Sequence, residues 1–261
     1  CLMDDTFFNV CMDGYIAGMA CILRIILALP ELIVERVTVQ ETTENLYGRG
    51  VRFDAFVRAG KRRMNVEVQR DERGAQPERA RFNSSMMDAR ELQKGEVVKE
   101  LPETYVIFIM EKDVFGKGLP IYHVRRMIEE TGEPFGDRTH IIYVNGEIQD
   151  ETPLGRLMHD FFCQDAETMY YEELKQRAGF FKNEERGRVQ MCKIMDEIRQ
   201  AGFEYGMERG MERGMERGME RDRLESLRTI MQTMKLSEEE AMNALLIPLE
   251  KRAKYKALLA Q

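Results

Sequence analysis

Two stretches of alternating apolar and polar residues, joined by a short turn, predict a β-hairpin in the first third of the chain. In residues 51–57 every second residue is apolar, so Asp54 points away from the apolar face. That face consists of Val51, Phe53, Ala55 and Val57. Residues 64–69 repeat the pattern and place Glu67 on the polar face. Gly60, at which a positive φ costs little, provides the turn between the strands.

The register of this hairpin brings two carboxylates together. If Gly60 and Lys61 form a two-residue loop, Ala59 pairs with Arg62, and Asp54 then lies opposite Glu67. Directly opposed side chains have Cβ atoms roughly 4.5–5.5 Å apart, and like charges there are destabilising. A hard divalent cation such as Mg²⁺ removes that repulsion and keeps positions for water and phosphate oxygens. The pair is therefore a candidate metal centre, and the alternative is a polar face that is merely solvated.

The hairpin also resembles a known nuclease motif. Asp54, the short turn and Glu67-Val68-Gln69 are similar to the core of the PD-(D/E)XK nuclease superfamily, in its transposase-associated branch of recombination-promoting nuclease-like proteins. Residues 77–88, 101–110 and 115–122 resemble the segments that follow this motif, and the resemblance covers about residues 3–146. It implies an α/β, restriction-endonuclease-like fold with an αβββαβ core and a helical C-terminal extension. The implied activity is that of a Mg²⁺- or Mn²⁺-dependent DNA endonuclease associated with transposition or recombination.

The resemblance assigns roles to individual residues. It implies that Asp54 and Glu67 are catalytic and hold the metal, and that the backbone carbonyl of Val68 adds a ligand. Gln69 stands where the motif has Lys. An amide carries no positive charge and is not a general base, so Gln69 would orient the attacking water, and the activity would be modest.

A further carboxylate near the N-terminus is a candidate ligand. Residues 4–8 resemble the family's opening segment, in which Asp5 matches an acid that many of these enzymes add to the metal site. The alternative is an N-cap role for Asp4 or Asp5, because a carboxylate there accepts the free amides of the first helical turn.

The remaining pattern predicts the order of elements and the domains. Strands are expected at residues 32–41, 51–58, 62–69, 103–110, 119–126 and 139–145, and helices at 15–29, 77–93 and from about 153 onward. The predicted domains are a nuclease-like domain over 1–150, a helical cover over 151–205, a repeat helix over 206–221 and a small helical tail over 222–261. In that tail, Ser237 and Glu240 form a capping box, and Pro248 starts another helix.

The repeat helix consists of Gly-Met-Glu-Arg, four times in succession over residues 206–221. At helical spacing a four-residue period advances by 400°, so each residue type forms a slowly winding stripe. The methionine stripe is one candidate seam for a homo-oligomer, with Gly permitting close approach. The alternative is an expanded repeat tolerated as a solvated, partly frayed helix, since each Gly costs about 1 kcal/mol relative to Ala.

Charge and composition limit the kinds of partner that this protein can bind. The net charge of −7 disfavours broad adhesion to phosphate, but residues 52–81 carry nine basic and five acidic side chains around the candidate site. This patch is a candidate DNA-binding surface, unless its arginines pair with nearby acids. The apolar run at 15–29 is interrupted by Arg24 and ended by Pro30, so it predicts a buried helix and no membrane span. We expect a cytoplasmic protein.

A second function remains open at this point. The chain is either the endonuclease described above or a catalytically weak or inactive DNA-binding and oligomerisation module of a mobile element. In the second case the carboxylates are a relic and the repeat helix carries the function.

Overall fold

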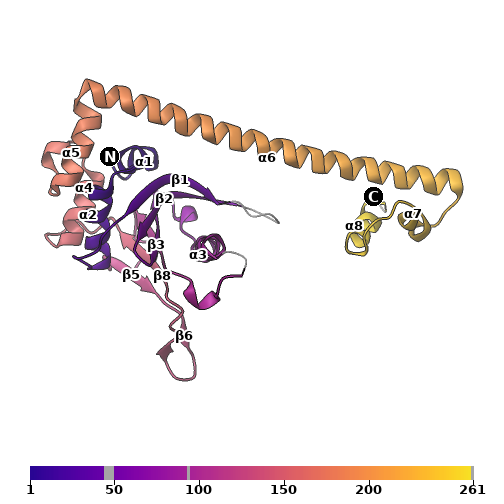
Figure 1. The fold of residues 1–261 in the computed structure, drawn as a ribbon, viewed down its shortest axis with the longest axis horizontal. Helices are drawn as coiled ribbons and strands as arrows, with labels where there is room; N and C mark the ends of the chain where they lie inside the picture. The colour runs from indigo at the N-terminus through magenta and orange to yellow at the C-terminus, as the bar shows by residue number, and fades with distance from the viewer. Residues whose placement is uncertain (44–49, 93–94, 260–261) are drawn as a thin grey trace. The chain divides into compact units, whose positions relative to one another are not determined.

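A computed structural model describes residues 1–43, 50–92 and 95–259. Its first compact unit is built around a mixed six-stranded sheet (Figure 1). Along the sheet the strands are β1 (Arg36–Thr43), β2 (Val51–Ala59), β3 (Arg62–Gln69), β4 (Glu103–Met110), β8 (Thr139–Asn145) and β5 (Ile121–Val124). β2 is antiparallel to both β1 and β3, β4 and β8 continue parallel to β3, and β5 is antiparallel to β8. This sheet with its flanking helices is consistent with an α/β restriction-endonuclease-like fold.

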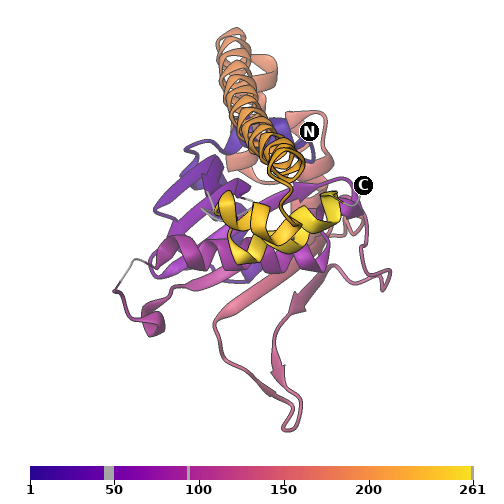
Figure 2. The ribbon, with the colours of Figure 1, turned by 90° about the vertical axis from the view of Figure 1, so that its right-hand side faces the viewer.

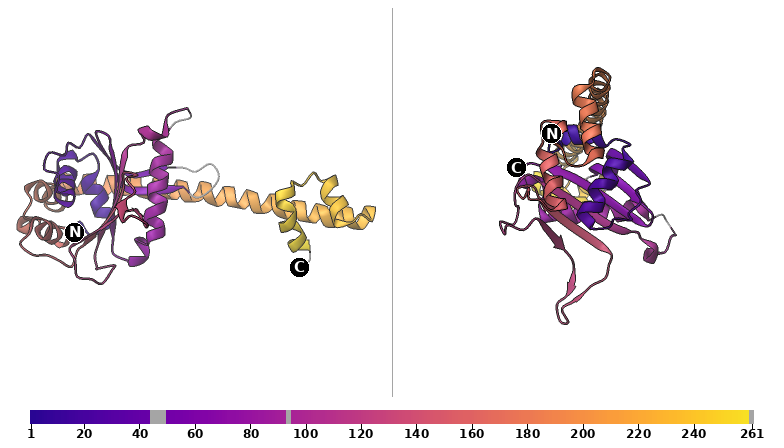
Figure 3. Two further views of the ribbon diagram at one scale, coloured as in Figure 1. Left: turned by 90° about the horizontal axis from the view of Figure 1, so that it is seen from below. Right: turned by 90° about the vertical axis from the view of Figure 1, so that its left-hand side faces the viewer.

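Helices cover both faces of the sheet. α3 (Pro77–Glu91) lies on one face, and the other face carries α1 (Asp5–Met12), α2 (Ile16–Leu27), α4 (Pro153–Phe162) and α5 (Glu172–Asn183) (Figure 3, left). Short 3-10 helices are η1 (Glu72–Gly74), η2 (Val98–Glu100) and η3 (Ala166–Thr168). Beneath α3, Met86 and Met87 pack in one core cluster with Phe108 and Tyr143 of the sheet. Both faces of β3 and β4 are consequently buried.

Most of the predicted elements are present, with shifted ends. β3 and β4 have the predicted bounds, whereas β1 begins at Arg36, four residues later than predicted, and β5 spans only Ile121–Val124. α3 ends at Glu91, and residue 93, the last of its predicted range, lies outside the described residues. A two-stranded ribbon of β6 (Met127–Ile128) and β7 (Glu133–Pro134) was not predicted (Figure 2). Its residues are exposed, so no burial pattern marks them in the sequence.

The predicted N-terminal apolar helix is α2. Met19, Ile22, Leu23 and Ile26 are buried, and Ala28 ends the helix in the left-handed conformation at φ 53°. Across the described ranges no single helix is long and apolar enough to cross a membrane. α1 and α2 together reach that length and composition, but they are bent by 117° at the break between them.

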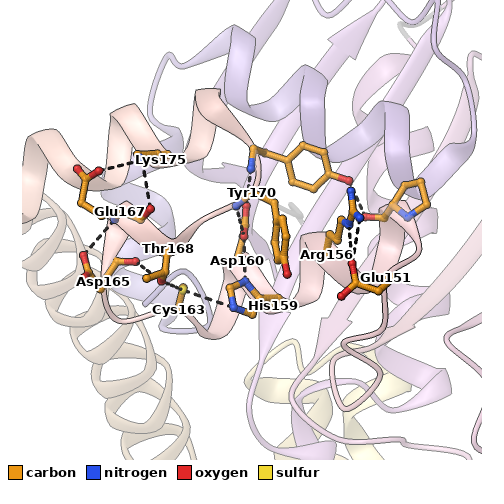
Figure 4. A network of polar contacts seen from close by, with 12 residues as sticks. Glu151, Arg156, His159, Asp160, Cys163, Asp165, Glu167, Thr168, Tyr170 and Lys175 are labelled. Atoms are coloured by element: carbon orange, nitrogen blue, oxygen red, sulfur yellow. Dashed lines mark hydrogen bonds and ion pairs between the residues drawn. The ribbon is translucent and has the colours of Figure 1, made fainter.

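A buried aspartate joins α4, η3 and α5 (Figure 4). The carboxylate of Asp160, which is fully buried, accepts hydrogen bonds from the amides of Tyr170 at 2.8 Å and Tyr171 at 2.9 Å. Nδ1 of His159 lies 3.2 Å from the same group. Because two backbone amides depend on one side chain, Asp160 fixes the start of α5 against the end of α4.

A second compact unit comprises Glu197–Gln261, and the first comprises Cys1–Asp196. The boundary falls inside α6 (Glu185–Met234), which contains the whole Gly-Met-Glu-Arg repeat. α7 (Glu238–Ala244) opens with the predicted capping box of Ser237 and Glu240, and α8 (Leu249–Leu259) begins directly after Pro248. The second unit has its own core, formed by Leu227, Ala241, Met242, Ile247 and Tyr255. Residues 260–261 of the predicted tail lie outside the described ranges.

Candidate metal centre

The hairpin register is as predicted at its turn. Ala59 pairs with Arg62, and the β2–β3 ladder continues to the pair of Ala55 and Val66. Asp54, one residue further on, accepts a hydrogen bond of 3.4 Å from the amide of Val68 to its Oδ2 atom. Its side chain therefore takes part in the hydrogen bonding between the two strands at the point where the ladder ends.

The alternation of β2 is interrupted at Asp54. Val51 and Phe53 belong to the core cluster beneath α3 together with Phe56, whose ring centroid lies 5.6 Å from that of Phe53. Ala55 and Val57 are not part of this cluster. The prediction that Val51 and Phe53 share a face of the sheet with Ala55 and Val57 is therefore wrong. The β1–β2 register omits the pair that Gln40 and Asp54 would form, and Gln40 has φ 53°. Such local irregularities re-aim side chains and are frequent beside active sites.

Glu67 is fully buried, and four side-chain donors surround its carboxylate. Asn65 at 3.1 Å and Asn83 at 3.4 Å donate to Oε1. Arg79 at 2.7 Å and Gln69 at 3.5 Å donate to Oε2. Arg79 and Asn83 lie one turn apart on α3, which covers this face of β3. The alternative of a solvated polar face is therefore excluded for β3.

Gln69 is placed on the same side as Glu67 by its contact with that residue and by η1. A Cβ atom built on Gly74 would lie 1.9 Å from Oε1 of Gln69, so the absence of a side chain at position 74 makes room for the amide. The 3-10 helix η1 is itself capped by Asp71, whose carboxylate accepts from the amide of Arg73 at 2.9 Å. Gly74 thus belongs to the site, although the sequence pattern did not single it out.

The electrostatics of the two carboxylates favour a bound cation. Burial, and after it the neighbouring Glu67 carboxylate, raises the pKa of Asp54 to about 8. Burial also raises the pKa of Glu67, against the opposing effects of Arg79 and Asn65. Without a cation, ionisation of both groups is therefore unfavourable, because two adjacent carboxylates repel each other and lose hydration when buried.

Residues 30–151 match the family model described as PD-(D/E)XK nuclease family transposase. The family predicted from the hairpin is thereby confirmed over this segment. The match includes β1 to β8 and α3, whereas residues 3–29, which the predicted resemblance also covered, lie outside it. No curated protein and no solved structure matches the chain.

PD-(D/E)XK nucleases generally use divalent metal ions, and the donors at this site suit such an ion. Asp54 and Glu67 offer carboxylate oxygens, and Asn65 and Asn83 have buried Oδ1 atoms without a donor in the part of the chain that the structure describes. The carbonyl of Val68 faces the same strand as its amide, because both groups of a strand residue point to one neighbour. Oxygen ligands of this kind fit Mg²⁺ or Mn²⁺.

Asp5, the further candidate ligand, lies outside the PD-(D/E)XK match. It is the first residue of α1, whereas Asp4 is the N-cap and accepts from the amide of Phe7 at 3.0 Å. Asp5 is exposed and accepts from the amide of Thr6, and its charge contributes to the raised pKa of Asp54. Within the described ranges, no three Asp, Glu, His or Cys side chains gather to hold a metal. A ligand role for Asp5 stays a prediction.

The basic patch around this candidate site is largely neutralised. Six of its members form ion pairs: Arg58 and Arg63 with Glu91, Arg62 with Glu103, Arg70 with Glu111, Arg73 with Asp71, and Arg79 with Glu67. Among the residues that the structure describes, Arg52, Lys61 and Arg81 have no ion pair. The alternative, in which the arginines pair with nearby acids, is therefore correct for most of the patch.

Besides Gly74 and the strand residue Asn65, the sequence pattern did not assign Arg79 and Asn83 of α3 to the candidate site. Their i, i+4 spacing in residues 77–91 puts both on one helical face, directly after the Glu67-Val68-Gln69 motif. That spacing was the available signal. It does not reveal which strand residue the face meets, because the docking of α3 depends on tertiary packing.

Proposed function

We propose that this protein is a metal-dependent DNA endonuclease associated with transposition or recombination. The observation that carries the proposal is the pair of Asp54 and Glu67, brought together at the end of the β2–β3 ladder with Glu67 fully buried. Burying like charges side by side is unfavourable unless a cation or a proton accompanies them. The match to the PD-(D/E)XK nuclease family transposase supports phosphodiester hydrolysis as the use of that arrangement.

In this proposal the chain's own residues divide the work. Asp54, Glu67 and the carbonyl of Val68 would hold the ion, while Asn65 and Asn83 fix the carboxylate of Glu67 from both the strand and the helix. Bound there, Mg²⁺ or Mn²⁺ would supply a Lewis acid for the phosphodiester and promote deprotonation of the attacking water. Gln69 would orient that water by hydrogen bonding, and it adds neither basicity nor charge.

The test is a plasmid-nicking assay with Mg²⁺, Mn²⁺ or EDTA, run on the wild type and on Asp54→Ala. We expect nicking with either ion, none with EDTA, and none by the variant. If the purified wild-type protein cleaves no DNA with either metal, the proposed endonuclease activity is refuted.

The second candidate is a DNA-binding and oligomerisation module, and the exposed methionines of α6 favour its oligomerisation part. Met207, Met211, Met215 and Met219 are between 57% and 66% exposed on the described surface. Four apolar side chains in one stripe gain stability by pairing with a second copy. We therefore propose a homo-oligomer through residues 206–221, which is compatible with either function. We also propose a cytoplasmic location, where the DNA substrate would be found.

A further inference from the structure

Arg79 is the cation that contacts the buried carboxylate of the metal centre. Its Nη2 atom lies 2.7 Å from Oε2 of Glu67. The residue is in the first turn of α3, where its amide donates to the carbonyl of Gln76 at 2.9 Å. The Arg79 side chain is 38% exposed, whereas that of Glu67 is fully buried. The guanidinium therefore extends from the interior of the site to its surface.

Gln69 contacts the same carboxylate oxygen from β3. Its Nε2 atom lies 3.5 Å from Oε2 of Glu67, so an uncharged amide and a guanidinium meet at one atom from two different elements. The amide occupies the position of the motif's Lys. Arg79 supplies a positive charge beside this amide, because its guanidinium contacts the same carboxylate oxygen.

Arg79 has donors to spare. A guanidinium carries five N–H donors in a rigid plane. Over the described ranges, the contact with Glu67 is the hydrogen bond made by this side chain, and no other partner is present. The exposed part of the group can therefore hold an anion while Nη2 stays on Glu67. Planar guanidinium groups suit phosphate oxygens because two N–H groups can bind in parallel.

We propose that Arg79 binds a non-bridging phosphate oxygen of the nucleic-acid strand at this centre, and so supplies the charge that Gln69 lacks. The inference rests on the proposed function for the identity of the substrate. It adds a phosphate-binding residue that comes from α3 and not from the motif strand.

The experiment measures binding and cleavage separately. Binding of a short DNA duplex is titrated with Ca²⁺ in place of Mg²⁺ at several salt concentrations, and plasmid nicking is followed with Mg²⁺. The variants are Arg79→Gln, which can still donate to Glu67, Arg79→Lys, and Arg79→Gln combined with Gln69→Lys. Arg81→Ala is the matched control, because it removes one exposed charge from the same helix.

We expect Arg79→Gln to weaken DNA binding by roughly tenfold and to reduce the salt slope by about one. Arg79→Lys should retain most of the affinity, and adding Gln69→Lys to Arg79→Gln should restore binding and nicking. Arg81→Ala should weaken binding less, and Gln69→Lys should not compensate for it. Thermal unfolding of each variant confirms that the fold is retained.

The role of Arg79 would be overturned if Arg79→Gln kept the wild-type affinity and salt slope, even if the wild type nicks DNA. It would also be overturned if adding Gln69→Lys to Arg79→Gln did not restore binding and nicking. Binding that depends on Arg79 without nicking by the wild type would support the phosphate contact and refute the endonuclease. A wild type that neither binds nor nicks DNA would overturn both.

Discussion

The amide of Val68 donates to Oδ2 of Asp54 across 3.4 Å, one residue beyond the last pair of the β2–β3 ladder. A side chain thus accepts a bond from the neighbouring strand's backbone. This contact holds the Asp54 carboxylate beside Glu67. The position of Asp54 therefore depends on the backbone of β3.

Replacing either acid by its amide should abolish divalent-metal-dependent cleavage. Asp54→Asn and Glu67→Gln remove ligand charge with little change in volume. The loss should exceed the roughly 10–100-fold typical of changing a residue that only orients a metal ligand. Cleavage rates with Mg²⁺ and Mn²⁺ measure the loss, and circular dichroism monitors the fold. Full activity in either variant would contradict the assignment of Asp54 and Glu67 as metal ligands.

Without metal, the stability of the folded first unit should fall as the pH rises from about 4 to about 8. The folded-state pKa of Asp54 is raised from 3.8 to about 8, so the folded protein binds the extra proton in this window and the unfolded chain does not. The measurement is the unfolding free energy in EDTA at several pH values. Because other groups titrate as well, the relevant quantity is the difference from Asp54→Asn, which should grow toward pH 8. A difference that does not change with pH would contradict the raised pKa.

Gly74→Ala should lower activity by displacing the amide of Gln69. The added Cβ would lie 1.9 Å from Oε1 of Gln69, a flexible end that can move aside, so stability should change little. The control is a double-mutant cycle with Gln69→Ala, in whose background Gly74→Ala should have no further effect. Gln69→Lys should keep or raise activity by restoring a cation near the phosphate. Equal effects of Gly74→Ala in both backgrounds would show that Gln69 is not the cause.

Asp160→Ala should destabilise the first unit by about 1–3 kcal/mol, because it removes the buried carboxylate that accepts from the backbone amides of Tyr170 and Tyr171. Urea unfolding measures the change. Asp165→Ala removes an exposed cap of η3 and should cost less. Equal losses for the two variants would mean that Asp160 contributes only as an ordinary cap.

Changing all four repeat methionines to Gln should reduce the mass observed by sedimentation, since it removes the exposed apolar stripe. The same four positions changed to Leu should preserve it. Deleting residues 206–221 should lower the mass while leaving the melting transition of the nuclease-like domain intact. Unchanged mass in the Gln variant would remove the oligomerisation claim.

The sequence predicted the hairpin well because the turn and both strands are defined by residues that are close together in the chain. The turn at Gly60 and the alternation of β3 define strand bounds and the pairing of Ala59 with Arg62. The change of phase at Asp54 was missed, since Phe53 is drawn to the α3 side by the core cluster. The same limit applies to Arg79, whose partner is decided by how α3 docks.

The sheet order has a consequence for the sequence of folding events. β2 and β3 are joined by two residues, whereas β3 and β4, which pair from Arg62 with Glu103 to Gln69 with Met110, are separated along the chain by α3. Short loops close at lower entropic cost, and hairpins form within about 1–10 μs. We expect the two carboxylates to meet early, in a hairpin still open to solvent, and to be covered by α3 later. Desolvation of Glu67 would then come after the hairpin has formed, so variants that weaken only α3 docking should leave an early intermediate with both acids in water.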